Sequence, residues 1–229
     1  MSQILLLLLL FTYGNASNKK DIIPVSTTYS YLALGDSYTI GEMVTPAENF
    51  PNQVVATMKS EDYNFKPARI TAKTGWTTDE LENGITAAND IEPIPTNYDF
   101  VTLLIGVNNQ YRGRSVASYR TEFEELLKKA IIYAGNRASR VVVLSIPDWG
   151  VTPFAEGRDR AKIAREIDVY NAANKEIALQ YNVYYIDITP WTREAATDNN
   201  LLASDGLHPS GKEYKRWAEQ LKLFFKTKI

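Results

Sequence analysis

The sequence predicts an α/β fold: one doubly wound domain in which helices cover both faces of a central five-stranded parallel sheet. Two observations lead to this prediction. Short apolar runs alternate with longer helical patterns along the whole chain, and no repeat, low-complexity tract or linker interrupts them. The short runs are apolar almost throughout, which indicates strands buried on both faces of a parallel sheet. Right-handed crossovers make such a sheet doubly wound, with ligands expected beyond the carboxyl ends of its strands.

The predicted strands are β-rich apolar runs, most of which end at a glycine or a proline. They cover residues 31–34, 65–71, 100–105, 141–146 and 183–188. The first ends at Gly35, the third at Gly106 and the fourth before Pro147, whereas the second is weaker and ends near Gly75. Because glycine and proline mark turns, each strand is expected to lead directly into a loop.

The predicted helices lie between these strands and after the last one. They cover residues 51–58, 78–89, 116–134, 159–181 and 211–226. In the third, apolar residues recur at helical spacing, and Gly135 is placed to cap its end. The last helix begins with Ser210 and Glu213, which are spaced as a capping box that would satisfy free backbone donors.

Composition limits the chemistry that the chain can perform. The length of 229 residues fits one domain, which we predict to span residues 27–229. The absence of cysteine excludes disulfides, thiol nucleophiles and iron–sulfur clusters, and a single histidine disfavours the common catalytic zinc sites. The 25 Lys and Arg against 27 Asp and Glu give no basic excess of the kind that nucleic-acid binders show. We expect no metal, no cofactor and no nucleic-acid partner.

The N-terminus resembles a secretory signal, which we predict to cover residues 1–16. An apolar run over residues 4–11 is followed by the small residues Gly14 and Ala16, and cleavage would follow Ala16. The run is too short to span a bilayer, so we expect no stable membrane span. The segment before it lacks the usual Lys or Arg. We therefore expect an exported protein, periplasmic or secreted.

The one histidine, His208, stands in a sequence that suits a catalytic base. Pro209 disfavours helical backbone at His208 and so favours a turn before the last helix. Asp205 comes three residues earlier, close enough for its carboxylate to reach one imidazole nitrogen. Such a carboxylate fixes the tautomer and leaves the other nitrogen free to act as a base. The alternative is a surface or helix-capping histidine.

Three other residues that follow predicted strands suit nucleophilic attack on an ester. Ser37 follows the first strand, and serine becomes a good nucleophile when an adjacent base takes its proton. The oxyanion that then forms needs hydrogen-bond donors, which the backbone of Gly75 and the side-chain amide of Asn108 can supply. Taken one at a time, these residues are also typical of a helix N-cap, a turn glycine and an Asx turn.

Together, the segments resemble the four signature blocks of the SGNH (GDSL-type) hydrolases, in order and over most of the chain. The matching residues are Gly35-Asp36-Ser37, Gly75, Gly106-x-Asn108 and Asp205-x-x-His208. The resemblance implies a three-layer flavodoxin-like fold and hydrolysis of carboxylic esters or thioesters. It also implies a triad of Ser37, Asp205 and His208, with an oxyanion hole formed by Ser37, Gly75 and Asn108. Tyr38 and Asn109 depart from the family's usual Leu and Asp, and Tyr38 is expected to narrow or polarise the pocket.

Aromatic residues near the strand ends are candidates for substrate binding. Tyr38, Trp76, Tyr111 and Trp149 are placed to line a sugar or acyl pocket, or else to pack against loops. Two arginines in the same region, Arg112 and Arg114, are expected to be surface charges rather than an anion site.

The sequence therefore predicts a serine hydrolase that works through an acyl-enzyme. The expected substrate is a small-molecule or glycan ester, with a short acyl group such as acetyl on a carbohydrate or other bulky alcohol. The alternatives are a lysophospholipase or acyl thioesterase of the same family, an acyltransferase, and a secreted carbohydrate-binding module without turnover.

Overall fold

A five-stranded, all-parallel sheet forms the centre of the computed structural model, which describes residues 27–229. Its strands are β2 (Tyr31–Asp36), β4 (Arg69–Lys73), β5 (Phe100–Leu104), β6 (Val141–Leu144) and β7 (Tyr184–Ile186). They lie in the order β4-β2-β5-β6-β7. Counted along the chain, this is the 2-1-3-4-5 order of flavodoxin-like sheets. The predicted α/β class and five-stranded parallel sheet are confirmed.

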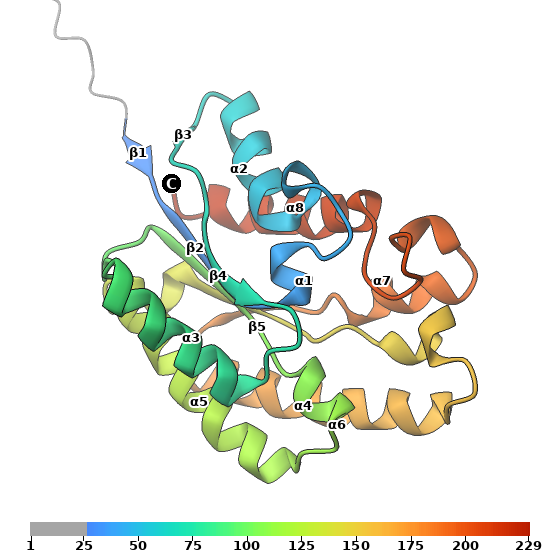
Figure 1. Ribbon diagram of the computed structural model, residues 1–229. Helices are drawn as coiled ribbons and strands as arrows, with labels where there is room; N and C mark the ends of the chain where they lie inside the picture. The colour runs from blue at the N-terminus through green and yellow to red at the C-terminus, as the bar shows by residue number, and fades with distance from the viewer. Residues whose placement is uncertain (1–26) are drawn as a thin grey trace, which may run out of the picture.

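Two helical layers cover the sheet (Figure 1). Helices α2 (Phe50–Ser60) and α8 (Gly211–Lys226) pack against each other on one face. Helices α3 (Thr78–Ile91), α5 (Val116–Tyr133) and α6 (Arg160–Gln180) cover the other. The five long helices therefore occur where the sequence predicts them, within a few residues at each end.

Shorter elements, which the sequence analysis did not predict, occupy the loops. The helices are α1 (Ser37–Ile40), α4 (Val107–Tyr111) and α7 (Thr189–Arg193). The 3₁₀ turns are Pro46–Glu48, Ala138–Arg140, Trp149–Val151, Pro153–Ala155, Glu194–Ala196 and Asn199–Leu201. A separate parallel pair joins β1 (Thr28–Tyr29) to β3 (Asn64–Phe65). Helix α1 begins directly after β2, and α4 begins three residues after the end of β5, which places both at the rim where ligands are expected.

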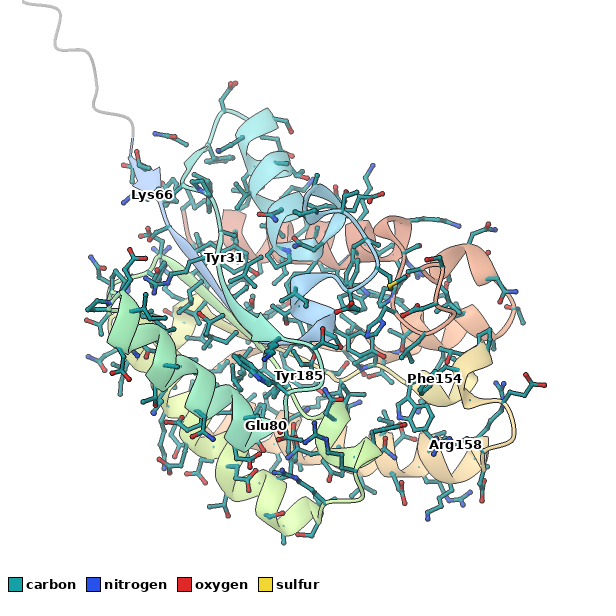
Figure 2. All side chains as sticks on the ribbon, in the orientation of Figure 1. Tyr31, Lys66, Glu80, Phe154, Arg158 and Tyr185 are labelled. Carbon is teal, nitrogen blue, oxygen red and sulfur yellow. The ribbon has the colours of Figure 1, made fainter. Side chains whose placement is uncertain are left out.

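Aromatic side chains join the last helix to the sheet. The Phe225 ring of α8 stacks on Phe100 of β5 with centroids 3.8 Å apart, and it meets Tyr31 of β2 edge to face at 5.3 Å. The Tyr31 hydroxyl shares a 2.8 Å hydrogen bond with Thr102. Side chains of this kind fill the space between the layers, Tyr31 among them (Figure 2). The core is therefore continuous from the sheet to the C-terminal helix.

The structure confirms one predicted helix cap and contradicts another. Gly135 follows α5 with φ +68° and donates its N–H to Ile132, as a C-terminal cap should. The capping box at α8 does not form. The Ser210 hydroxyl donates instead to the Asn200 carbonyl, and the Glu213 carboxylate accepts the indole N–H of Trp217. That prediction was wrong because tertiary partners compete for both side chains.

The predicted signal segment, residues 1–16, lies outside the described residues. Within residues 27–229, no helix has the length and apolar character needed to cross a membrane.

Candidate active site

The candidate site lies where the strand order reverses. Strands β2 and β5 are neighbours, but the chain continues from β2 outward to β4 and from β5 in the opposite direction to β6. Loops that leave two such strands diverge, and ligands bind in the crevice between them. Ser37 follows β2 directly, and Asn108 follows β5 by a short loop.

The structure brings Ser37, His208 and Asp205 together in a hydrogen-bonded chain. Ser37 Oγ lies 3.0 Å from His208 Nε2, and His208 Nδ1 lies 2.6 Å from Asp205 Oδ2. The second carboxylate oxygen, Oδ1, accepts the backbone N–H groups of Leu207 and His208, each at 3.0 Å. Ser37 and His208 are buried, with 4% and 7% of their surface exposed. Because Asp205 occupies Nδ1 of His208, Nε2 is the imidazole nitrogen available to accept the serine proton.

Asp205 is held in its ionised form. Burial would raise the pKa of this carboxyl, but hydrogen bonds from the His208 imidazole and from two backbone N–H groups outweigh it. The pKa therefore lies below its ordinary value. An ionised carboxylate fixes the orientation of the imidazole and stabilises the imidazolium that forms when His208 accepts a proton.

The local sequence determines how Ser37 is presented. Asp36 is the N-cap of α1, and its carboxylate accepts the Tyr38 N–H at 3.0 Å. A side chain at Gly35 would overlap both the Leu104 carbonyl oxygen and the Thr39 hydroxyl group. Glycine is therefore required at this position for β2 to approach β5 before the chain turns into the helix that begins with Ser37.

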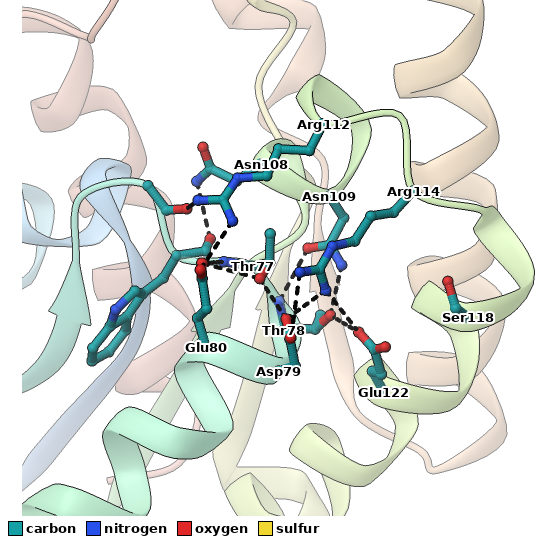
Figure 3. Close-up of polar contacts among 12 residues, drawn as sticks. Thr77, Thr78, Asp79, Glu80, Asn108, Asn109, Arg112, Arg114, Ser118 and Glu122 are labelled. Carbon is teal, nitrogen blue, oxygen red and sulfur yellow. Dashed lines mark hydrogen bonds and ion pairs between the residues drawn. The ribbon is translucent and has the colours of Figure 1, made fainter.

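The predicted oxyanion donors lie on loops that contact one another. Asn108 Nδ2 donates to the Trp76 carbonyl at 3.0 Å (Figure 3). The same nitrogen lies 3.4 Å from Asp36 Oδ2. Gly75 has φ +83°, a conformation that favours glycine, and its carbonyl accepts Arg112 Nη2 at 2.6 Å. These contacts tie the loop that carries Gly75 to the short helices α4 and α1, which carry Asn108 and Ser37.

The two arginines near the site are paired with carboxylates. Arg112 forms a 2.9 Å ion pair with Glu80, and Arg114 forms a 2.5 Å ion pair with Asp79 (Figure 3). Both act as structural surface charges, as the sequence analysis favoured over an anion site. Asn109 is also structural: it is buried, and its amide is hydrogen-bonded to Thr78.

A pocket of about 130 Å³ opens beside Ser37 and His208. Its lining consists of Ser37, Tyr38, Val107, Asn108, Tyr111, Trp149, Phe154, Leu207 and His208. Three of the four aromatic residues that the sequence predicts are thus present. Phe154, Val107 and Leu207 were missed, although Phe154 follows the fourth strand just as Trp149 does and could have been found by the same rule.

Trp76 is the exception, and its prediction as a pocket residue was wrong. Its indole ring packs on α3, where it occupies the space that a side chain at Gly84 would need. Only the backbone carbonyl of Trp76 reaches the site, through its hydrogen bond from Asn108. Because Gly84 has no side chain, the indole ring can pack on α3 instead of entering the pocket.

The ring positions of Trp149 and Tyr38 are fixed by neighbours. The Trp149 indole N–H donates to Gln110 at 2.7 Å, and the Gln110 amide donates to Glu166 at 2.8 Å. The Tyr38 ring lies 5.0 Å from the His208 ring between centroids. The aromatic walls of the pocket are therefore held in place by contacts within the protein.

Within residues 27–229, no group of three or more His, Cys, Asp or Glu is arranged to hold a metal ion. The reactive groups of the site are a hydroxyl, an imidazole and a carboxylate, with amide donors nearby.

Comparison with known proteins identifies the family. The model of the GDSL-like lipase/acylhydrolase family matches residues 33–216, which contain all the candidate catalytic, oxyanion-hole and pocket residues. No curated protein matches the chain.

Three solved structures illustrate the similarity in fold. A psychrotrophic esterase from Pseudoalteromonas sp. is 16% identical with a TM-score of 0.64, covering 86% of this chain and 97% of its own. An acetylxylan esterase from Geobacillus stearothermophilus is 18% identical with a TM-score of 0.64, covering 86% and 94%. A lipase/acylhydrolase from Enterococcus faecalis is 22% identical with a TM-score of 0.61, covering 87% and 96%. At these identities the likeness shows a shared fold.

Proposed function

Because this chain belongs to the GDSL-like lipase/acylhydrolase family, and is a carboxylic ester hydrolase, we propose that it cleaves its substrate through an acyl-enzyme on Ser37. The acyl group is short, such as acetyl, and the alcohol is a carbohydrate or another bulky alcohol. The observation that carries the mechanism is the hydrogen-bonded chain from Ser37 Oγ through His208 to Asp205.

In the first half of the proposed reaction, His208 Nε2 takes the proton of Ser37 as Oγ attacks the ester carbonyl. The resulting oxyanion accepts hydrogen bonds from the backbone N–H groups of Ser37 and Gly75 and from the Asn108 amide. The proton on Nε2 then passes to the alcohol oxygen, the C–O bond breaks, and the alcohol leaves.

The second half repeats these steps with water. His208 removes a proton from a water molecule, which attacks the acyl carbonyl, and returns that proton to Ser37 Oγ as the carboxylic acid departs. The distance of 3.4 Å between Asn108 Nδ2 and Asp36 is long for a hydrogen bond, so this N–H is the one most easily redirected to the oxyanion.

The size and lining of the pocket support a short acyl group. Its volume of about 130 Å³ is small beside the roughly 300–1,000 Å³ of pockets that enclose larger ligands. Aromatic side chains are also suited to stacking on the faces of sugar rings. The acetylxylan esterase that shares the fold acts on an acetylated carbohydrate, which is the substrate class proposed here.

A panel of acetyl, butyryl and octanoyl esters, together with acetylated sugars and a lysophospholipid, tests the proposal. We expect the highest kcat/KM for acetyl or butyryl esters. Ser37→Ala should lower kcat by about 10⁴-fold or more, because loss of the nucleophile leaves only binding and oxyanion stabilisation. The matched control is Ser60→Ala, which removes an exposed serine at the end of α2.

Full activity of Ser37→Ala would contradict the mechanism, and a preference for octanoyl esters or lysophospholipid would contradict the proposed substrate class. A fluorophosphonate probe separates an enzyme from a binding module with the same fold. The proposal requires covalent labelling of the wild type at Ser37.

We also propose that the protein is exported and that a peptidase cleaves it after Ala16, because of the apolar N-terminal run and the small residues that follow it. Intact-mass analysis of protein recovered outside the cytoplasm tests this. A chain that starts at Ser17 supports the proposal, and a chain that retains residues 1–16 contradicts it.

A further inference from the structure

An aromatic cluster extends from the pocket to the surface of the molecule. Trp149 lies 5.3 Å from Tyr111 and 6.0 Å from Phe154 between ring centroids, and Tyr111 and Phe154 are 6.2 Å apart. Trp149 is buried, whereas Tyr111 and Phe154 are each 44% exposed. Exposed aromatic rings that continue a pocket are typical of a surface that contacts a ligand.

Arg158 lies over this cluster. Its guanidinium carbon is 5.5 Å from the Tyr111 ring centroid and 5.8 Å from that of Trp149. Figure 2 shows Arg158 beside Phe154, close to the start of α6. Two cation–π contacts hold the guanidinium against the rings, and they leave its N–H groups free to donate at the edges of the plane.

The N–H groups of Arg158 have no carboxylate partner within residues 27–229, since none of the ion pairs there includes this residue. Arg112 and Arg114, by contrast, are each paired with an acidic residue. Arg158 therefore combines a fixed position with unused donors.

Two contacts place Arg158 relative to the candidate catalytic residues. The Phe154 N–H donates to the Gly206 carbonyl at 3.2 Å, which ties the segment before α6 to the loop that carries Asp205 and His208. The backbone N–H of Arg158 donates to the Ala155 carbonyl at 3.1 Å, while the guanidinium N–H groups take no part in this bond. Arg158 does not line the pocket that contains Ser37; it lies beyond Tyr111 and Trp149, which do.

We propose that Arg158, supported by the rings of Tyr111 and Trp149, binds a negatively charged group on the alcohol part of the substrate. A guanidinium presents paired donors that match the two oxygens of a carboxylate or a phosphate. A short acyl group cannot extend past the aromatic rings, so the anion belongs to the alcohol. The inference rests on the proposed function, because it assumes that the ester is cleaved at Ser37.

Three acetate esters built on one phenol ring test the proposal. They are 4-acetoxybenzoate, 4-acetoxyphenyl phosphate, and the neutral methyl ester of 4-acetoxybenzoate. For Arg158→Gln we expect kcat/KM to fall by roughly twofold to fivefold for at least one anionic ester and to change by less than about 1.5-fold for the neutral one, as for a partly exposed charge pair. The larger loss shows whether carboxylate or phosphate is the preferred group. Added salt should reduce the difference.

The control is Arg165→Gln, which removes an exposed positive charge from a different depression on α6. An equal effect of Arg158→Gln on all three esters, or an equal effect of the two variants, would overturn the role of Arg158. Hydrolysis of the neutral ester by the wild type, and its loss in Ser37→Ala, tests the proposed function separately. The two hypotheses can therefore fail independently.

Discussion

Asp36, the residue before the proposed nucleophile, is a buried carboxyl whose environment disfavours its charge. It is 1% exposed, and burial raises its pKa from the ordinary 3.8 to about 7, against hydrogen bonds from Tyr38, its own backbone and Asn108. Because the pKa is higher in the folded state than in the unfolded state, the protonated form favours folding. This contribution to stability is fully present below about pH 3.8 and is lost as the pH rises through about 7.

Replacing Asp36 with Asn should remove this pH dependence. Asn remains a good N-cap for α1, and its side chain is neutral at every pH. Relative to the wild type, we expect the free energy of unfolding of Asp36→Asn to rise between pH 5 and pH 8, by up to a few kcal/mol. Urea denaturation at several pH values measures the difference. The control is Asp62→Asn, which removes an exposed carboxylate and should show no such trend. The same pH dependence of unfolding in the wild type and in Asp36→Asn would contradict a role for the Asp36 carboxyl.

The sequence could predict which residues meet at the site, but not the direction of every side chain. Ser37, Asp205 and His208 were expected together because each follows a strand or precedes a helix at one rim of a parallel sheet. Their hydrogen-bond distances agree with that expectation. Trp76 also follows a strand, yet its ring lies on α3, the helix that begins two residues later, because Gly84 of that helix leaves room for the indole. A position after a strand does not determine whether a side chain turns into the pocket or onto the next helix.

Element lengths explain which helices and strands could be predicted. Helix α8 spans Gly211–Lys226, the predicted range, because its apolar face repeats over four turns. Helices α1 and α4 have only four and five residues, which is too short for a periodic pattern to appear. The second strand, predicted over 65–71, is displaced: β4 spans Arg69–Lys73, and Phe65 instead lies in β3, which pairs with β1. Strand β2 continues two residues past its predicted end, whereas β5, β6 and β7 are shorter than their apolar runs.

Substitutions at Gly84 and Trp76 test whether the indole ring packs on α3 only because position 84 has no side chain. Gly84→Ala should destabilise the wild type by about 1–3 kcal/mol, since the new methyl group overlaps the indole ring. In a Trp76→Ala background the ring is absent, and the same change should stabilise the protein by up to about 1 kcal/mol through helix propensity. Urea denaturation of the four proteins gives the coupling energy between the sites.

Asn83→Ala is the matched control, because Asn83 is an exposed residue of the same helix. Asn83→Ala should change the free energy of unfolding by the same amount in the wild type and in the Trp76→Ala background. A coupling energy near zero between Gly84 and Trp76 would mean that the ring does not depend on the missing side chain.

At the scale of the whole molecule, the C-terminal helix connects the sheet to the loop that carries His208. Phe225 stacks on Phe100 of β5 and on Phe65 of β3, and it meets Tyr31 of β2 edge to face. The loop that precedes α8 contains Asp205 and His208. Packing of this helix therefore stabilises the fold as one unit, while the position of His208 depends more directly on its local hydrogen bonds.

Phe225→Ala separates these two roles. Removing a fully buried ring from a closely packed core should lower the free energy of unfolding by about 3–5 kcal/mol. Leu223→Ala, at a position 56% exposed on the same helix, should change it by no more than about 0.5 kcal/mol. At a temperature where Phe225→Ala is still folded, its kcat and pH profile on a short-chain ester should match those of the wild type, because the contacts of His208 with Asp205 and Ser37 lie within the loops and α1. A large loss of kcat in the folded variant would instead show that α8 packing positions His208 directly.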